Sequence, residues 1–343
     1  GTTNNGGAAT DDGSASGDGL NIAVLYYNYS DAFISNVRNE MDAKWEELGI
    51  TFNNQDGNTN AGTQLDQVNT AIANGVNALV VNAVEASADE TTQAIVDAAK
   101  NANIPVIFFN REVSNDVINS YDKAAFVGTD PAEAGHMQGE LIGNYLLENY
   151  DAVDLNGDGV ISYVMFKGQE NNPEAEYRTQ FAVEDANAIL TEAGKPALAY
   201  YDSAAATQYL VDPNGSWSSA AAQDYMTTIL SAYSEASGNM VELVIANNDD
   251  MGLGAITALE TAGYNTGAEG STTIPVFTVD GLQGIVDAIN AGKATGAVGQ
   301  SASGLAEAVA TLLQNYQETG DLMSNTEGMN VGADVAKIRV PYT

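Results

Sequence analysis

Oxygen-bearing side chains at alternate positions mark one short loop as a candidate site for a hard cation. Every second position is occupied by a suitable ligand residue: Asp154, Asn156, Asp158 and Val160. This spacing lets several oxygens of a tight turn face one ion, with the Val160 carbonyl as a further ligand, as in the first part of an EF-hand calcium loop. The motif requires a glutamate at its twelfth position, where this chain has Met165. The loop is therefore not an EF-hand, and either a calcium site completed from elsewhere or a polar turn without an ion remains open.

A second group of polar residues follows apolar runs that read as β-strands. Its members are Asp31, Asn110, Asn248 and Asp280. Ligands of open parallel sheets bind beyond the carboxyl ends of the strands, where these residues fall. Each one alone is also a common turn residue or helix cap. Because four such positions recur, we expect them to form one binding site.

The elements that would position these residues alternate between strand and helix. Strand-like runs cover 22–26, 78–81 and 106–109, with amphipathic helices near 33–48 and 88–101. After residue 130 the pattern restarts, with strands near 161–166, 243–246 and 276–279. Alternation of this kind predicts parallel sheets with helices on both faces, and 343 residues suit two such lobes.

Composition limits the classes of partner and chemistry. The chain has 46 acidic and 11 basic residues, a net charge of −35, one histidine and no cysteine. Nucleic acid and anionic lipid surfaces require cationic patches, so we expect neither as a partner. Disulfides and thiol chemistry are excluded. Residues 1–19 contain no large apolar side chain, which predicts a disordered tether and suggests a surface lipoprotein.

Enzyme classes with this kind of fold require motifs that the chain lacks. The first strand leads into YNYSD at 27–31, with no Gly-x-Gly-x-x-Gly turn for a dinucleotide. No Gly-x-Ser-x-Gly elbow or P-loop occurs either. A transcriptional regulator would carry a DNA-binding domain, for which 1–19 is too short and too acidic. We therefore expect binding without catalysis.

Several motifs together resemble one known family. They are VIFFNRE at 106–112, DLNGDGVI at 154–161, KGQENNPEAEYR at 167–178, VELVIANNDD at 241–250 and RVPY at 339–342. The chain from about 21 to 342 resembles the bacterial galactose/glucose-binding proteins, which are substrate-binding proteins of ABC sugar transporters. This resemblance implies the type I periplasmic binding protein fold, with two doubly wound, Rossmann-like α/β lobes.

The resemblance also implies three hinge crossovers between the lobes, at 128–130, 300–302 and 339–342. The N-terminal sugar-binding lobe would comprise 20–129 plus 301–338. The C-terminal lobe, with the calcium loop, would comprise 130–300 plus 339–343. Compared with the family, 205–215 reads as an insertion without an assigned role.

The family pattern carries a set of sugar contacts onto this sequence. They are Asp31, Phe33 and Asn110 from one lobe, and Asn172, Glu174, Arg178, Trp217, Asn248, Asp280 and Gln300 from the other. Two aromatic side chains of this set would sandwich the sugar ring, and the arginine fork would donate to two hydroxyls. Three residues depart from the family pattern: Asn172 replaces a histidine, Glu174 an aspartate and Gln300 an asparagine. The ranking of glucose and galactose therefore stays open.

The resemblance supplies the missing calcium ligand as Glu242, and it assigns the ninth loop position to Ser162. The implied protein is a monomeric, extracytoplasmic receptor, periplasmic or lipid-anchored at the cell surface. It would capture D-glucose or D-galactose by hinge closure and deliver the sugar to a membrane permease, with a chemoreceptor as a further possible partner. The alternative is a receptor for another small polar ligand, namely a pentose, a disaccharide or a furanose signal.

Overall fold

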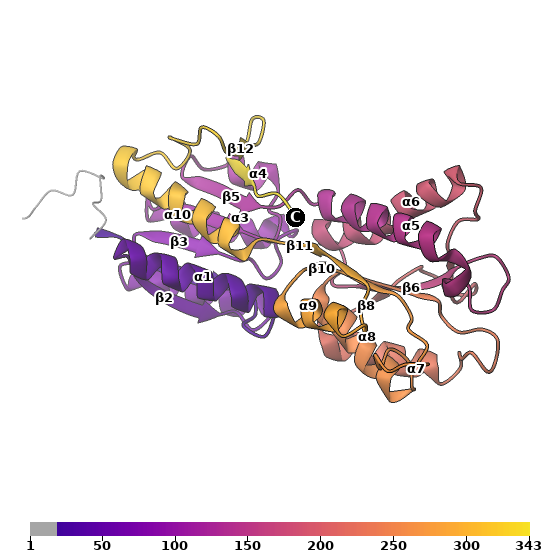
Figure 1. The fold of residues 1–343 in the computed structure, drawn as a ribbon. Coiled ribbons are helices and arrows are strands. Elements are labelled where there is room, and N and C mark those ends of the chain that lie inside the picture. The colour runs from indigo at the N-terminus through magenta and orange to yellow at the C-terminus, as the bar shows by residue number, and fades with distance from the viewer. Residues whose placement is uncertain (1–18) are drawn as a thin grey trace, which may run out of the picture.

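The computed structural model describes residues 19–343 as two α/β lobes arranged end to end (Figure 1). The predicted tether lies outside the described residues, apart from Gly19. Within the described part of the chain, no helix combines the length and the apolar character needed to cross a bilayer.

The first lobe is built on a seven-stranded sheet in the order β12-β13-β5-β4-β3-β1-β2. Its strands pair in parallel, except for β12 against β13. They are β1 (Asn21–Tyr26), β2 (Thr51–Asp56), β3 (Ala78–Val81), β4 (Val106–Phe109), β5 (Ala124–Gly128), β12 (Asn330–Val331) and β13 (Lys337–Arg339).

Helices cover both faces of this sheet because alternate residues of each strand point to opposite sides. Ile22 and Val24 of β1 pack in one core with α1 (Ala32–Leu48) and α10 (Ala302–Thr319). Ala23 and Leu25 pack in the other core. That second core also holds α2 (Ala61–Ala73), α3 (Asp89–Asn101) and α4 (Asn115–Asn119).

The second lobe repeats the plan with a sheet in the order β11-β10-β9-β6-β7, to which β8 adds beside β6. Its strands are β6 (Ser162–Lys167), β7 (Ala199–Tyr200), β8 (Leu210–Val211), β9 (Leu243–Ala246), β10 (Val276–Asp280) and β11 (Gly296–Gly299). One face carries α5 (Glu133–Val153) and α6 (Pro173–Glu192). The other face carries α7 (Ser219–Leu230), α8 (Asp249–Thr261) and α9 (Gln283–Asn290).

The predicted fold class of two doubly wound lobes is confirmed. The order β2-β1-β3-β4-β5 of the first lobe matches β7-β6-β9-β10-β11 of the second, strand for strand. In this order the chain winds outward in both directions from its first strand, so the loops after the central strands diverge and leave a crevice. The crevices of the two lobes face each other across the crossovers.

Three segments connect the lobes. One follows β5 at Gly128, and the second follows β11 at Gly299, whose N–H and C=O both pair with Thr343. The third differs from our predicted lobe boundary at 339. Arg339 pairs with Gly128 inside the first sheet, and its guanidinium binds Glu112 at 2.6 and 2.8 Å. Arg339 therefore belongs to the first lobe, because its backbone and its charge are both satisfied there.

Candidate functional site

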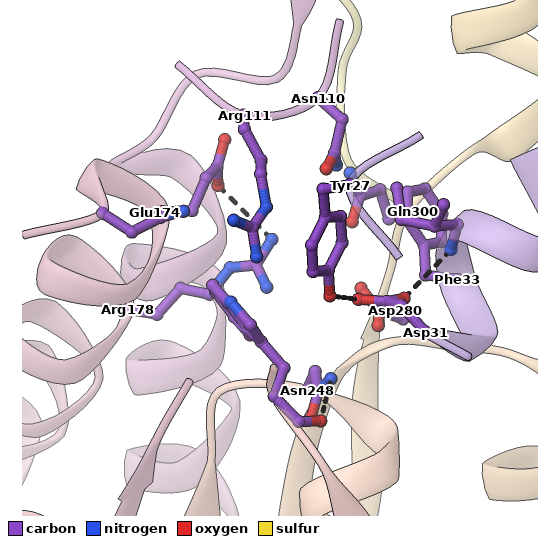
Figure 2. A pocket seen from close by; sticks show the side chains of 13 residues that line it. Tyr27, Asp31, Phe33, Asn110, Arg111, Glu174, Arg178, Asn248, Asp280 and Gln300 are labelled. Carbon is purple, nitrogen blue, oxygen red and sulfur yellow. Dashed lines mark hydrogen bonds and ion pairs between the residues drawn. The ribbon is translucent and has the colours of Figure 1, made fainter. Parts of the chain in front are cut away.

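A cavity lies between the lobes and is lined by residues of both (Figure 2). The structure places all the predicted sugar contacts around it. These are Asp31, Phe33, Asn110, Asn172, Glu174, Arg178, Trp217, Asn248, Asp280 and Gln300. Residues that are about 270 positions apart in the chain thus share one wall, from Asp31 to Gln300. Tyr27, Ile34 and Arg111 also line the cavity and were not predicted.

Asp31 caps a helix and also lines the cavity. One carboxylate oxygen accepts the Ile34 N–H at 3.0 Å and caps α1. The other oxygen accepts the hydroxyl of Tyr27. These bonds fix the carboxylate at the cavity wall, so it is preorganised for a ligand. Phe33 likewise packs in the first-lobe core while it lines the cavity.

Asn110 follows β4 in the left-handed backbone region, at φ 68°. Asparagine tolerates this conformation better than most side chains do, which suits it to the sharp turn. Its amide oxygen accepts from the Asn82 side chain at 3.3 Å. The strand end and its turn therefore hold a polar group against the cavity.

Arg178 projects from α6 and is almost entirely buried. One terminal nitrogen donates to the Asn247 carbonyl at 2.9 Å, and the other donates to the Tyr342 hydroxyl at 2.6 Å. Its Nε is buried and has no hydrogen-bond partner among the described residues. A buried donor without a partner is costly, so this site is better satisfied when a ligand supplies an acceptor.

Glu174 reaches the crossovers as well as the cavity. Thr129 donates to one carboxylate oxygen at 2.7 Å, while Tyr342 and Arg178 donate to the other at 2.9 and 3.3 Å. Burial raises the pKa of Glu174, and the Arg178 charge opposes this shift. The carboxylate therefore links α6 to the first and third crossovers.

Trp217 is 8% exposed and adopts φ 55°, which is unusual for a bulky residue. Its ring occupies the space in which a Cβ at position 168 would lie, only 2.0 Å from a ring carbon, so only Gly168 fits there. The Asn248 side chain donates to the Trp217 carbonyl at 3.1 Å and also caps α8. The indole is thus held in position over the cavity from two sides.

The remaining predicted contacts are also tied to helix starts and strand ends. Asn172 caps α6 and donates to Gln169 at 3.0 Å. Gln300 follows β11, and its N–H donates to the Asp280 carbonyl at 2.7 Å. Burial raises the pKa of Asp280 well above its ordinary range, repulsion from Asp249 adds to the shift, and the opposite charge of Arg178 reduces it.

Two of the three unpredicted cavity residues, Tyr27 and Arg111, had a usable signal in the sequence. Arg111 directly follows Asn110 at the end of β4, and Tyr27 directly follows β1. Both lie beyond the carboxyl ends of strands, the same criterion that selected Asp31. The family pattern assigns no sugar contact to Tyr27 or Arg111, so neither was among the predicted contacts.

The predicted metal ligands gather at the other end of the second lobe. Carboxylate oxygens of Asp154, Asp158 and Glu242 lie within 4.8 Å of one another. A buried oxygen of Asp154 has no hydrogen-bond partner among the described residues. An orphaned acceptor beside two further carboxylates fits the donor set that a calcium ion requires.

Other ligands of the predicted set are partly occupied with the protein itself. Glu242 accepts the Ser162 N–H at 3.0 Å, and the Ser162 hydroxyl donates to Glu242 at 3.3 Å. Asn156 accepts the Asp158 N–H at 3.2 Å, and Asp158 accepts the Val160 N–H at 3.0 Å. Burial raises the pKa of Glu242, backbone donors including Ser162 oppose the shift, and Asp154 adds to it.

Comparison with known proteins identifies the family. The model of the periplasmic binding protein domain matches residues 22–321. The D-galactose/methyl-galactoside binding periplasmic protein MglB of Haemophilus influenzae is 35% identical over 324 residues, which cover 94% of this chain and 88% of that protein. The putative rhizopine-binding protein of Rhizobium meliloti is 28% identical and covers 83% of this chain and 79% of its own length.

Solved structures share the fold. An ABC transporter solute binding protein from Clostridium phytofermentans, with bound β-D-glucose, aligns with a TM-score of 0.72 at 20% identity, covering 94% of this chain and 92% of that one. The relatives are binding proteins, which confirms the expectation of binding without catalysis. With its two doubly wound lobes and a ligand cavity between them, the chain belongs to the periplasmic binding protein family, in its type I fold.

Proposed function

We propose that this protein is an extracytoplasmic receptor that captures a hexose, D-glucose or D-galactose, and delivers it to the permease of an ABC transporter. The observation that carries the proposal is the composition of the inter-lobe cavity. It combines Phe33 and Trp217, from opposite lobes, with carboxylate, amide and guanidinium groups. Apolar faces suit the C–H surfaces of a pyranose, and planar polar groups suit its adjacent hydroxyls.

Hinge closure is the proposed mechanism of capture. The cavity walls come from both lobes, so a ligand that contacts them all is enclosed only when the lobes are together. Sugar hydroxyls would supply the acceptor that Arg178 Nε lacks. They would also donate to the carboxylates of Asp31 and Asp280, which line the same cavity. The closed form of a monomer is the form that we propose a permease recognises, with a chemoreceptor as a second candidate partner.

The most similar of the relatives compared is named for a hexose, but other relatives are named for other ligands. The protein at 35% identity is named for D-galactose and methyl-galactoside, whereas more distant ones are named for rhizopine and galactofuranose. A receptor for a pentose, disaccharide or furanose is therefore the second candidate. Asn172, Glu174 and Gln300 are the side chains at which the two candidates would separate.

Calorimetric titration with D-glucose, D-galactose, D-ribose and D-xylose tests the proposal. We expect saturable binding of a hexose at micromolar or lower Kd, and at least tenfold weaker binding of the pentoses, whose missing hydroxymethyl group leaves buried polar groups unpaired. Tighter binding of a pentose than of both hexoses would favour the second candidate. Absence of binding to all four sugars would contradict capture of a monosaccharide of this kind.

We also propose that the 154–162 loop and Glu242 hold a structural calcium ion. Support comes from the three converging carboxylates and the partnerless Asp154 oxygen. The ion would tie the loop between α5 and β6 to the start of β9. Binding to the folded state alone raises its stability with calcium concentration.

The calcium proposal predicts a metal-dependent melting temperature. Millimolar calcium should raise the Tm of the wild type by several degrees over the chelated protein, whereas Glu242→Ala should lose most of this increase. Asp158→Asn changes an exposed ligand and should also reduce it. Glu192→Ala, an exposed residue of the same lobe, is the control and should keep the full increase. An unchanged increase in both ligand variants would disprove the assignment.

A further inference from the structure

The segment before Trp217 is an ordered part of the second lobe rather than a loose excursion. Within it, β8 pairs in parallel with β6, with Leu210 opposite Phe166 and Val211 opposite Lys167. The Tyr225 hydroxyl of α7 donates to the Val211 carbonyl at 2.6 Å. The insertion therefore extends the sheet at the strand end that faces the cleft.

A tight turn organised by Asp212 follows β8. Asp212 is buried, and its carboxylate accepts from Asn214 N–H at 2.8 Å and from the N–H and hydroxyl of Ser218 at 2.9 and 2.7 Å. The Asp212 carbonyl accepts from Gly215 N–H at 3.0 Å. This turn fixes Gly215 two residues before Trp217, with its carbonyl available to the opposite lobe.

Arg111 of the first lobe meets that carbonyl. It is 3% exposed, and one terminal nitrogen donates to Val84 within its own lobe at 2.7 Å. The other terminal nitrogen donates to Gly215 at 3.3 Å, across the cleft. The guanidinium lies 3.5 Å from the centre of the Tyr27 ring, whose hydroxyl binds Asp31. Figure 2 shows Arg111 and Tyr27 side by side at the cavity.

We infer that Arg111 and the turn carrying Gly215 form a latch that holds the lobes closed over a bound ligand and sets its rate of release. Its contacts with Val84 and Tyr27 already orient the Arg111 side chain. Closure therefore adds one charge-assisted hydrogen bond and costs little further side-chain entropy. The Gly215 carbonyl is within reach of Arg111 only when the lobes are together. Arg111 is thus a positioning residue that acts through the second lobe, and this inference rests on the proposed function.

Rates of binding separate a latch from a general contribution to folding. Stopped-flow fluorescence with D-glucose and D-galactose reports on Trp217, since Trp45 is buried in the first-lobe core. Arg111→Met should release the sugar about tenfold faster, with association changed less than twofold, because the lost bond forms only after encounter. Arg111→Lys keeps a donor and should restore most of the slow release.

A matched control and a coupling test sharpen the assignment. Arg38 stacks on Tyr29 at 3.8 Å within the first lobe, so Arg38→Met should release sugar at the wild-type rate. Asp212→Ala loosens the turn, and combined with Arg111→Met it should add little, because both changes remove one contact. The latch would be disproved if the release rate of the double variant rose by the product of the two single effects. It would also be disproved if Arg111→Met changed the rates of association and release equally.

Inter-lobe distance provides a readout that does not depend on sugar. Since the chain has no cysteine, Glu40→Cys and Asp287→Cys can carry two spin labels on exposed positions of α1 and α9. Arg111→Met should lower the closed fraction relative to the same labelled chain with Arg111, and an unchanged fraction would overturn the latch. Failure of the wild type to bind any sugar would instead contradict the proposed function.

Discussion

Glu174 lines the cavity and also binds two of the crossovers between the lobes. Both its carboxylate oxygens are engaged, by Thr129 and Tyr342 from two crossovers and by Arg178 from its own helix. The hydroxyls of Thr129 and Tyr342 also lie 2.8 Å apart. Hydrogen bonds among buried groups are strong in this low-dielectric setting, so the network holds these side chains in one arrangement. The wall of the cavity and the crossovers are therefore held together by the same side chain.

Removal of the Glu174 carboxylate should destabilise the protein strongly. Glu174→Ala leaves the Arg178 cation buried without its charge partner, which we expect to lower the free energy of unfolding by about 3 kcal/mol. Glu174→Gln keeps an acceptor for Thr129 and should lose roughly half as much. Urea unfolding measures both. Glu184, which is exposed on the same helix, provides the control, and Glu184→Ala should change the free energy of unfolding by less than about 0.5 kcal/mol. If Glu174→Ala lost no more stability than Glu184→Ala, this account would be contradicted.

Helix α5 packs against α6 through a row of glycines four residues apart. A Cβ at Gly135 would lie 2.6 Å from the Tyr177 carbonyl, and one at Gly139 would lie 2.6 Å from the Asp185 Cβ. At Gly143 the nearest atoms belong to Ile189, at 2.9 Å. The two helices therefore approach closely along the whole row, so α6 carries its site residues on a rigid support.

Substitution within the glycine row should separate the helices. Gly139→Ala forces a Cβ against the α6 backbone and should lower stability by about 1–3 kcal/mol. Gly284→Ala is the matched control, since its Cβ would meet only ordinary contact at 3.4 Å in α9. It should be neutral or stabilise by up to about 1 kcal/mol through helix propensity. Denaturant unfolding compares the pair, and equal effects would show that close packing is not the reason.

Across the whole molecule, closure brings like charges together. The Ala32 N–H of the first lobe lies 3.4 Å from the Asp250 carboxylate of the second, with Asp31 beside it. Burial raises the pKa of Asp250 from 3.8 to about 6, with repulsion from Asp31 and Asp249 adding and the Ala32 N–H opposing. In the proposed open form Asp250 would be exposed and farther from Asp31, so its pKa would be lower. Closure thus takes up protons between about pH 4 and 6.

Sugar affinity should therefore rise as the pH falls through about 6. Above that pH the ionised Asp250 opposes closure, so Asp250→Asn should bind the sugar about threefold to tenfold tighter than the wild type at pH 7.5. The two proteins should converge below about pH 4, where Asp250 of the wild type is protonated in the open form as well as in the closed form. Calorimetry at several pH values checks this, and parallel curves for both proteins would exclude Asp250 as the titrating group.

Sequence patterns predicted most of the strands and helices that hold the cavity, and four of the cavity residues from the ends of the strands. The apolar run at Val106–Phe109 and the one at Leu243–Ala246 become strands with those bounds, because a short buried strand of a parallel sheet is apolar on both faces. Asp31 and Asn248 could be placed because the ends of parallel strands meet at one edge of a sheet. Such inferences use only residues that are close together in the sequence.

Contacts between groups that are distant in the chain became known from the packing of the folded protein. It showed Glu174 bound to Tyr342, Arg111 bound to Gly215, and Arg339 kept in the first sheet. The insertion likewise has no pattern that reveals β8, whose two residues are a strand only because β6 lies beside them. Local spacing cannot predict these contacts, because their partners are distant in the chain, by 168 residues for Glu174 and Tyr342 and by 104 for Arg111 and Gly215.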